Sequence, residues 1–161
     1  MQTPPHFFTH TLILGGQKSG KSRYAELLAK AWLEKSPQHC ACLMATAQAH
    51  DAEMAARIAR HRSDRSARVP PLQTLEEPLA LAQSIARLST PHTLLVVDCL
   101  NLWLTNMLMP MQPQDARTPA YIHAQTAALQ AALAQAPGPV VLVSNEIGLG
   151  LIPLAPAVRQ F

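Results

Sequence analysis

Aromatic and charged side chains are both scarce in this chain. Phe, Trp and Tyr make up 4% of its 161 residues and Asp, Glu, Lys and Arg 14%, whereas 48% are hydrophobic. We therefore expect a core of Leu, Val, Ile, Met and Ala. The formal net charge of +3 is too small to indicate nucleic-acid binding by itself, and we predict no nucleic-acid partner. The length suits one domain, residues 1–161.

Cysteine is also rare, and targeting segments are lacking. Cys40, Cys42 and Cys99 are an odd number, and the first two do not have zinc-ligand spacing. We expect them to be buried thiols on strands in a reducing compartment. The first residues lack the basic-then-apolar pattern of a signal peptide, and no apolar run approaches the roughly 20 residues of a membrane span. These absences predict a cytoplasmic protein without a membrane span.

What the chain does contain is a glycine-rich loop between an apolar strand, residues 11–14, and a helix, residues 20–35. The loop at residues 15–22 fits the phosphate-binding pattern G-x-x-x-x-G-K-[ST] in its required context. Its N–H groups and the positive end of the helix form an anion nest. Lys21 is expected to reach the outer phosphates, and the Ser22 hydroxyl to ligate Mg²⁺. The loop predicts a nucleotide-binding protein.

The rest of the chain alternates between strands and helices. Further strands are predicted at residues 40–46, 93–97 and 140–143, and further helices at 51–65, 77–88, 101–108 and 119–135. The last two strands are continuous apolar runs, which is typical of strands buried on both faces. This alternation favours an α/β sandwich with a largely parallel sheet, and four strands are a small sheet for that class.

Two strand ends carry polar residues suited to a site. Asp98 ends the apolar run of residues 94–97, where a P-loop fold holds the Mg²⁺ shell with a carboxylate; the alternative is an ordinary polar residue at a strand end. Residues 145–150, Asn-Glu-Ile-Gly-Leu-Gly, follow the last strand. They form either a loop at the carboxyl edge of the sheet, where ligands bind in open α/β folds, or a simple exit turn.

The helix at residues 51–65 carries a histidine among arginines. Met54, Ile58 and His61 fall on one face of it. One interpretation of His61 is a core histidine with a satisfied hydrogen bond. The other is a nucleophile that attacks the α-phosphorus of a nucleoside triphosphate while arginines neutralise the developing charge. The arginines either cover a solvated helix face or face an anion, and they are Arg57, Arg60, Arg62, Arg65 and Arg68.

Together these stretches resemble the bifunctional adenosylcobinamide kinase / adenosylcobinamide-phosphate guanylyltransferase family of cobalamin biosynthesis. The resemblance runs from Leu12 to the end of the chain. It rests on the loop at 15–22, A-T-A at 45–47, E-M-A-A-R-I-x-x-H-R at 53–62, T-x-E-x-P at 74–78, D-C-L-x-L-W-x-x-N at 98–106 and N-E-I-G-x-G-x-x-P at 145–153. The phosphate loop is shared by many functions, whereas the histidine helix and the last stretch, in this order, are specific.

The resemblance implies a P-loop NTPase-like (RecA-like) three-layer sandwich that performs two reactions. ATP or GTP phosphorylates the aminopropanol hydroxyl of adenosylcobinamide. A histidine then attacks GTP, releases pyrophosphate and passes GMP to the new phosphate, which gives adenosylcobinamide-GDP. His61 matches that histidine, and it is the only candidate because Arg60 stands where some members have a second one. The resemblance also implies a homotrimer with sites shared between subunits.

The resemblance carries the family's nucleotide-contacting positions over to the following residues, of which Ser22 and Asp98 are also the expected Mg²⁺ ligands: Gly15, Gly16, Gln17, Lys18, Ser19, Gly20, Lys21, Ser22, Ala45, Thr46, Ala47, Arg62, Ser63, Asp64, Arg65, Glu76 and Asp98.

The chain departs from the family pattern in three places. Relatives usually have Arg-Pro and an aromatic residue after the histidine helix, but residues 65–69 are Arg-Ser-Ala-Arg-Val. The fourth loop position, usually Arg, is Lys18, which keeps the charge but loses the fork. Relatives continue beyond residues 145–150 with another helix and strand. We expect this chain to lack both and to be less stable than its longer relatives, because a sheet edge or core face would be uncovered.

Two other functions compete with this one. A P-loop small-molecule kinase would transfer only phosphoryl groups and would use His61 structurally. A nucleotide-dependent switch or assembly ATPase is the second alternative, but the chain has no Asn/Thr-Lys-x-Asp motif for reading guanine. Neither alternative accounts for the histidine helix and residues 145–150 occurring together.

Overall fold

The computed structural model describes residues 10–49, 51–112, 115 and 117–146 of the chain. The strands in this part are His10–Gly15 (β1), Cys40–Ala45 (β2), Gln73–Glu76 (β3), Thr93–Asp98 (β4) and Val140–Asn145 (β5). The helices are Lys21–Leu33 (α1), Ala52–Arg68 (α2), Leu81–Leu88 (α3), Leu100–Leu108 (α4) and Pro119–Gln135 (α5).

The strands form one sheet in the order β1-β5-β4-β2-β3, and every pairing is parallel. The expected largely parallel α/β sheet is therefore confirmed. The expectation of four strands is wrong, because β3 adds a fifth at one edge. This strand has only four residues, two of them exposed, so it lacks the apolar run by which the other strands were recognised.

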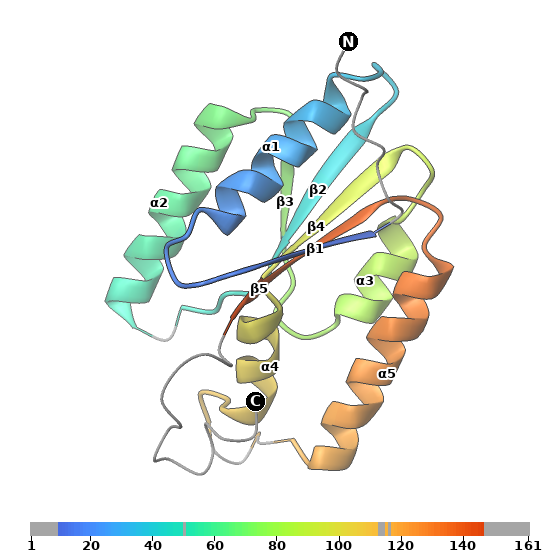
Figure 1. Ribbon diagram of the computed structural model, residues 1–161. Coiled ribbons are helices and arrows are strands. Elements are labelled where there is room, and N and C mark those ends of the chain that lie inside the picture. Colours follow the sequence, from blue (N-terminus) through green and yellow to red (C-terminus); the bar gives the residue numbers. More distant parts are fainter. Residues whose placement is uncertain (1–9, 50, 113–114, 116, 147–161) are drawn as a thin grey trace.

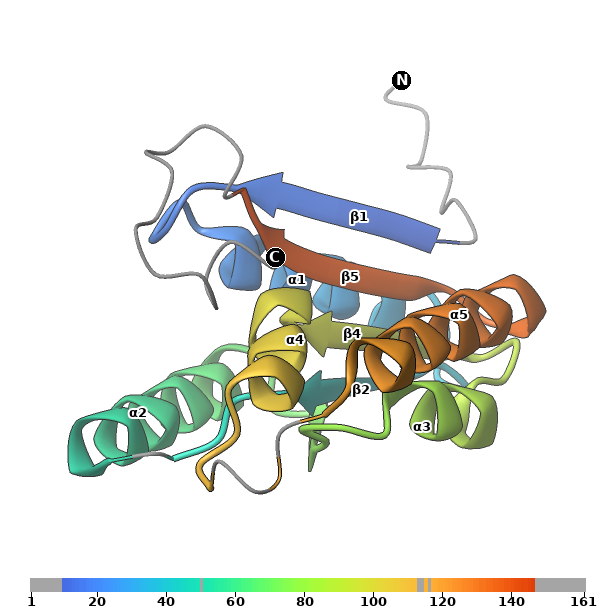
Figure 2. The same cartoon turned by 90° about the horizontal axis from the view of Figure 1, so that it is seen from below.

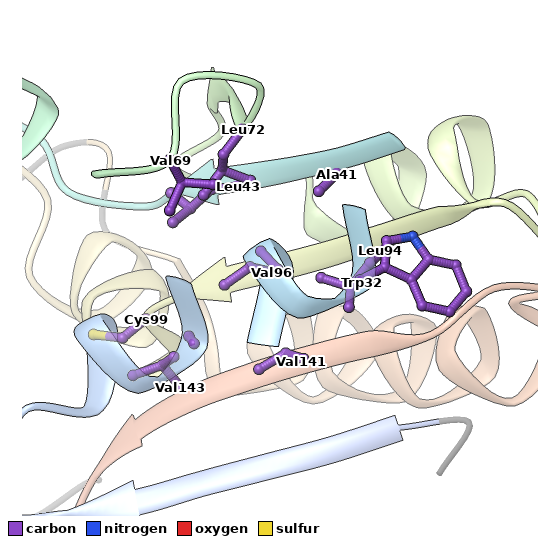
Figure 3. Close-up of a cluster of buried hydrophobic side chains, with 12 residues drawn as sticks. Trp32, Ala41, Leu43, Val69, Leu72, Leu94, Val96, Cys99, Val141 and Val143 are labelled. Atoms are coloured by element: carbon purple, nitrogen blue, oxygen red, sulfur yellow. The ribbon is translucent and has the colours of Figure 1, made fainter. Parts of the chain in front are cut away.

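Helices cover both faces of the sheet, as Figures 1 and 2 show. Residues of β4 alternate between the two faces, since Leu94 and Val96 pack in the cluster under α1 while Leu95 and Val97 pack in the cluster under α3, α4 and α5. Figure 3 shows the first cluster, in which Trp32 of α1 lies over β4 and β5. The expected three-layer sandwich is confirmed, and β4 in its middle layer is buried on both faces.

Local signals explain where most helices begin and end. Asp51 caps α2 by accepting a hydrogen bond from the Met54 amide at 2.7 Å, as expected of an N-cap. Thr118 caps α5 in the same way, with Pro119 in the first turn. Helix α2 runs three residues further than predicted, because no proline interrupts it before Pro70.

The cysteines only partly follow the prediction. Cys99 is buried, Cys42 is half-buried and Cys40 is exposed, and all three are free thiols. The prediction of buried thiols is therefore wrong for Cys40, which lies at the beginning of β2, where the strand reaches solvent. Cys99 is not on a strand, because it precedes α4 directly. None of the described helices combines the length and the apolar character needed to cross a bilayer.

Candidate active site

The carboxyl ends of the strands meet along one edge of the sheet. In the strand register Ala45 lies beside both Glu76 and Asp98, and Gly15 lies beside Asn145. Four of these five positions belong to the segments singled out as nucleotide-contacting, and Asn145 is the last residue of β5 and the first of the stretch at 145–150. Ligands bind at this edge in open α/β folds, so parallel pairing alone gathers segments that are far apart in the chain.

The phosphate loop leads from the end of β1 to the beginning of α1. Gly20 has a φ of 88° and is the N-cap residue of α1, so the turn uses the left-handed conformation that favours glycine. Lys18 also lies in this region, with a φ of 58°. The Lys21 ammonium donates to the Gly16 carbonyl at 2.6 Å. The loop thus places a lysine and the free N–H groups of a helix start at the sheet edge, which suits a polyphosphate.

Asp98, at the end of β4, links the loop to helix α2. Burial raises the pKa of the Asp98 carboxyl, and a hydrogen bond from the Ser22 hydroxyl and the charges of Arg65 and His61 lower it, whereas the charge of Glu26 raises it further. These residues come from α1, α2 and β4. Ser22 and His61 are thus both close enough to the Asp98 carboxyl to influence its charge.

The residues at this point fit a magnesium ion bound together with phosphates. Ser22 and Asp98 supply a hydroxyl and a carboxylate oxygen in contact with one another, and hard oxygen ligands of this kind suit Mg²⁺. The described residues contain no group of three or more His, Cys, Asp or Glu side chains that could hold a metal. A cation here would therefore take its remaining ligands from phosphate and water.

Buried hydrogen bonds hold the segment after β2, residues 46–47, in place. Thr46 is fully buried; its hydroxyl donates to the Cys99 carbonyl and accepts from the Cys99 amide, both at 2.8 Å. The buried Asn106 amide donates to the carbonyls of Thr46 and Pro78 at 2.8 and 3.0 Å. The Thr46 side chain is thus used within the fold. Ala45 packs against the core cluster under α1, and Ala47 borders a hollow beside α2.

His61 is exposed on α2, so its interpretation as a core histidine is wrong. It shares a face of the helix with Arg65, one turn further on. Arg65 is buried, and its Nε donates to the Thr74 hydroxyl on β3 at 3.2 Å. Burial lowers the pKa of Arg65, and the carboxylates of Glu26 and Asp98 oppose this effect. An accessible imidazole therefore lies beside an anchored guanidinium and near the Asp98 carboxyl.

Next to this face, α2 borders a hollow of about 520 Å³. Ile58 and Arg62 line it from the helix, Ala47 from the segment after β2, and Glu76 and Pro78 from the end of β3. The Arg62 guanidinium lies 3.5 Å from the Glu76 carboxylate at its rim. The hollow combines apolar walls with one carboxylate, a composition that suits a planar base with N–H donors.

Some predicted positions are less closely connected to the site. Ser63 and Asp64 are exposed on α2, and Ser63 lies on the side of the helix opposite His61. Arg57 and Arg60 are exposed as well. Residues 147–150 of the last predicted loop lie outside the described residues. The Asn145 end of that stretch is held by Asn101, whose side chain accepts from the Ser144 hydroxyl at 2.9 Å and from the Asn145 amide.

Sequence reasoning missed Asn101 and Glu26, which support the site, and it singled out Asn106 only as the last residue of the stretch at 98–106. Asn101 and Asn106 lie on α4 and fasten the ends of β5 and β2. Glu26, in the middle of α1, pairs with Arg68 at the end of α2. For Glu26, the available signal was its position four residues after Ser22 on the same helix, on the face that is buried in the structure.

Known proteins that are similar to this chain belong to the family that the sequence motifs resemble. The family model described as cobinamide kinase / cobinamide phosphate guanyltransferase matches residues 11–161. The bifunctional adenosylcobalamin biosynthesis protein CobP of Pseudomonas aeruginosa is 46% identical over 151 residues, which are 93% of this chain and 79% of that protein. The protein CobU of Escherichia coli, which has the same description, is 34% identical over 157 residues, or 93% and 82% of the two chains.

Among solved structures, the flagellar accessory protein FlaH of Methanocaldococcus jannaschii matches 88% of this chain and 62% of its own, with 11% identity and a TM-score of 0.49.

Proposed function

The chain belongs to the cobinamide kinase / cobinamide phosphate guanyltransferase family, and on this premise we propose how its own residues perform the two reactions. Adenosylcobinamide is phosphorylated with ATP or GTP, and GMP from GTP is then transferred to the product to give adenosylcobinamide-GDP. One observation carries the assignment of residues: exposed His61 lies within electrostatic reach of Asp98, which contacts Ser22 of the phosphate loop.

In the kinase step the phosphate loop binds and orients the triphosphate. The N–H groups of the loop and of the first turn of α1 donate hydrogen bonds to the phosphate oxygens, and the Lys21 ammonium moves from the Gly16 carbonyl to the outer phosphates. Ser22 and Asp98 would hold a Mg²⁺ ion, which would supply neutralisation of the phosphate charge. The cobinamide hydroxyl attacks the γ-phosphorus, and the nucleoside diphosphate leaves.

In the transfer step His61 acts as the nucleophile. A neutral imidazole nitrogen attacks the α-phosphorus of GTP, so that an N–P bond forms while the bond to the β-phosphate oxygen breaks and pyrophosphate leaves. Arg65, held by Thr74, neutralises charge on the phosphates during this step. An oxygen of cobinamide phosphate then attacks the same phosphorus, and His61 is released.

The hollow beside α2 is the place we assign to the guanine base in the transfer step. Glu76 lies at its rim, and its two carboxylate oxygens can accept hydrogen bonds from two N–H donors at once. Guanine offers such a pair at N1 and N2, whereas adenine does not. Ile58 and Pro78 supply apolar walls for the ring faces. Ser63 and Asp64 carry no assigned step and remain candidates for contacts with the ligand.

The decisive test is incubation with GTP labelled at the α-phosphate, in the presence of Mg²⁺. We expect an acid-labile, alkali-stable protein adduct that is abolished, to below about 1% of wild type, in His61→Ala, because no other nucleophile replaces the imidazole. His123→Ala, at an exposed position on α5, is the matched control and should label fully. Equal labelling of His61→Ala would refute the assignment. Absent labelling of wild type with retained phosphoryl transfer would favour a kinase without the transfer step.

The homotrimer implied by the family resemblance is also part of the proposal, with adenosylcobinamide, its phosphate and nucleoside triphosphates as small-molecule partners.

A further inference from the structure

Helix α2, which carries the proposed nucleophile, is held by polar contacts more than by apolar burial. Of residues 52–68, all of them described, only Arg65 is buried. Figure 2 shows the helix at one side of the molecule, apart from the sheet. Buried Val69 and Leu72 follow its last residue and fix the chain there, but they do not direct the helix. Its orientation must depend on the side chains that reach from it to neighbouring elements.

Three such contacts are present in the described part of the chain, and they differ in strength. Arg62 and Glu76 are 3.5 Å apart and both well exposed, so their pairing contributes little. The Arg65 Nε donates to the Thr74 hydroxyl at 3.2 Å. Arg68 forms two parallel bonds to Glu26, from Nε to Oε2 at 2.8 Å and from Nη2 to Oε1 at 3.1 Å.

The third contact, between Glu26 and Arg68, restricts the relative position of α1 and α2 most strongly. The Glu26 side chain is 4% exposed, and the Arg68 side chain 39%. A bidentate, charge-assisted pair restricts direction as well as distance, and a buried carboxylate has few alternative partners. Arg68 is available for it because residues 65–69 lack a proline, so that α2 continues to Arg68.

The Glu26–Arg68 pair connects the two functional segments of the site, the phosphate loop with α1 and the histidine helix α2. Glu26 lies one turn after Ser22 on α1, the helix that begins at the phosphate loop. Arg68 lies two turns after His61 on the same face of α2. We propose that the Glu26–Arg68 pair is a positioning device for guanylyl transfer, which sets the place of His61 relative to the phosphates held by the loop. The inference rests on the proposed role of His61.

The two reactions should respond differently to the loss of this pair. Guanylylation requires the imidazole in line with the α-phosphorus, and a misplacement of about 1 Å can reduce such a step about 100-fold. The kinase step uses the loop, Ser22 and Asp98, none of which is on α2. A general loss of folding would lower both reactions together, so the ratio of the two rates separates positioning from stability.

The test compares Arg68→Met with the double variant Glu26→Met plus Arg68→Met. The double variant is the more informative, because replacing both partners avoids leaving a buried unpaired carboxylate. In single-turnover labelling with α-labelled GTP, we expect both variants to guanylylate at least about tenfold more slowly than wild type. Phosphorylation of cobinamide by ATP should stay within about threefold. Arg68→Lys, which keeps the charge but not the fork, should be intermediate.

Lys30→Met is the matched control, because Lys30 pairs with Glu34, the C-cap residue of α1, in an exposed contact of 3.9 Å. It should leave both reactions unchanged. The positioning role is overturned if the double variant labels at the wild-type rate, or if its kinase rate falls in parallel with labelling. Failure of wild type to label would instead overturn the proposed function itself, so the two failures are distinguishable.

Discussion

At the scale of single residues, the phosphate loop holds one side chain in a conformation that costs stability. Lys18 has a φ of 58°, where a non-glycine residue is destabilised by roughly 1–2 kcal/mol. Gly20 has a φ of 88° without this cost. A strained lysine at a proposed triphosphate site is explained by its charge, which glycine would not supply.

This contrast leads to a paired prediction for the loop. Lys18→Gly should raise the free energy of unfolding, by up to about 1 kcal/mol after the greater chain entropy of glycine is subtracted, and should weaken triphosphate binding. Gly20→Ala should lower the free energy of unfolding by about 1–2 kcal/mol. Urea titration and binding of a fluorescent triphosphate measure the two effects. A Lys18→Gly variant that is less stable than wild type would contradict the argument.

The loop residues could be identified from the sequence because their pattern is local and contiguous. His61 could be found as a candidate, but its exposure could not, since helical spacing does not say which neighbours cover a face. The pairing of Glu26 with Arg68 was beyond sequence reasoning. It joins positions 42 residues apart, and nothing in either helix alone indicates the partner.

At the scale of elements, the start of α3 depends on a carboxylate that precedes it. Glu77 accepts hydrogen bonds from the Ala80 amide at 2.7 Å and the Ser84 hydroxyl at 2.6 Å. Burial alone would raise the pKa of Glu77, but the bonds from Ser84, Ala80 and Leu79 and the charge of Arg87 together hold it below its ordinary value of 4.5. The helix therefore begins at Leu81, whereas the sequence predicted that it would begin at residue 77.

The lowered pKa predicts a pH dependence of stability. A carboxyl with a depressed folded-state pKa stabilises the fold above its unfolded value, and this contribution is lost as pH falls through the folded value. Glu77→Gln should cost about 1 kcal/mol at neutral pH. Below about pH 4.5 its unfolding free energy should approach that of wild type. Denaturant unfolding between pH 7 and 3 checks this, with exposed Glu34→Gln as control; a constant difference across the range would contradict it.

Most elements were predictable because their patterns are strong and local. Continuous apolar runs marked β1, β2, β4 and β5, and the N-caps Asp51 and Thr118 marked two helices. Strand β3 was not predicted, because it is a strand through its pairing with β2 and not through its own composition. The end of α2 was predicted too early, because no proline interrupts the helix before Pro70 and it continues to Arg68.

At the scale of the whole molecule, the proposed homotrimer is open to direct measurement. Sedimentation equilibrium should give three times the chain mass of 17.5 kDa. If sites are shared between subunits, dilution below the dissociation constant should lower guanylylation more than it lowers phosphorylation. A monomeric mass at full activity would contradict this part of the proposal. The trimer rests on the family resemblance, since a single chain contains no information about its neighbours.

The order of the strands has a consequence for how the protein is made. Strand β1 leads into the phosphate loop, and its partner in the described sheet is β5, with His10 beside Val140. Among the described strands, synthesis delivers β1 first and β5 last, and pairing between such distant segments is slow. Until then the apolar side chains of β1 have no neighbour strand and are a liability for aggregation. The ability to bind nucleotide is thus acquired late, after translation has passed residue 145, although the loop itself leaves the ribosome early.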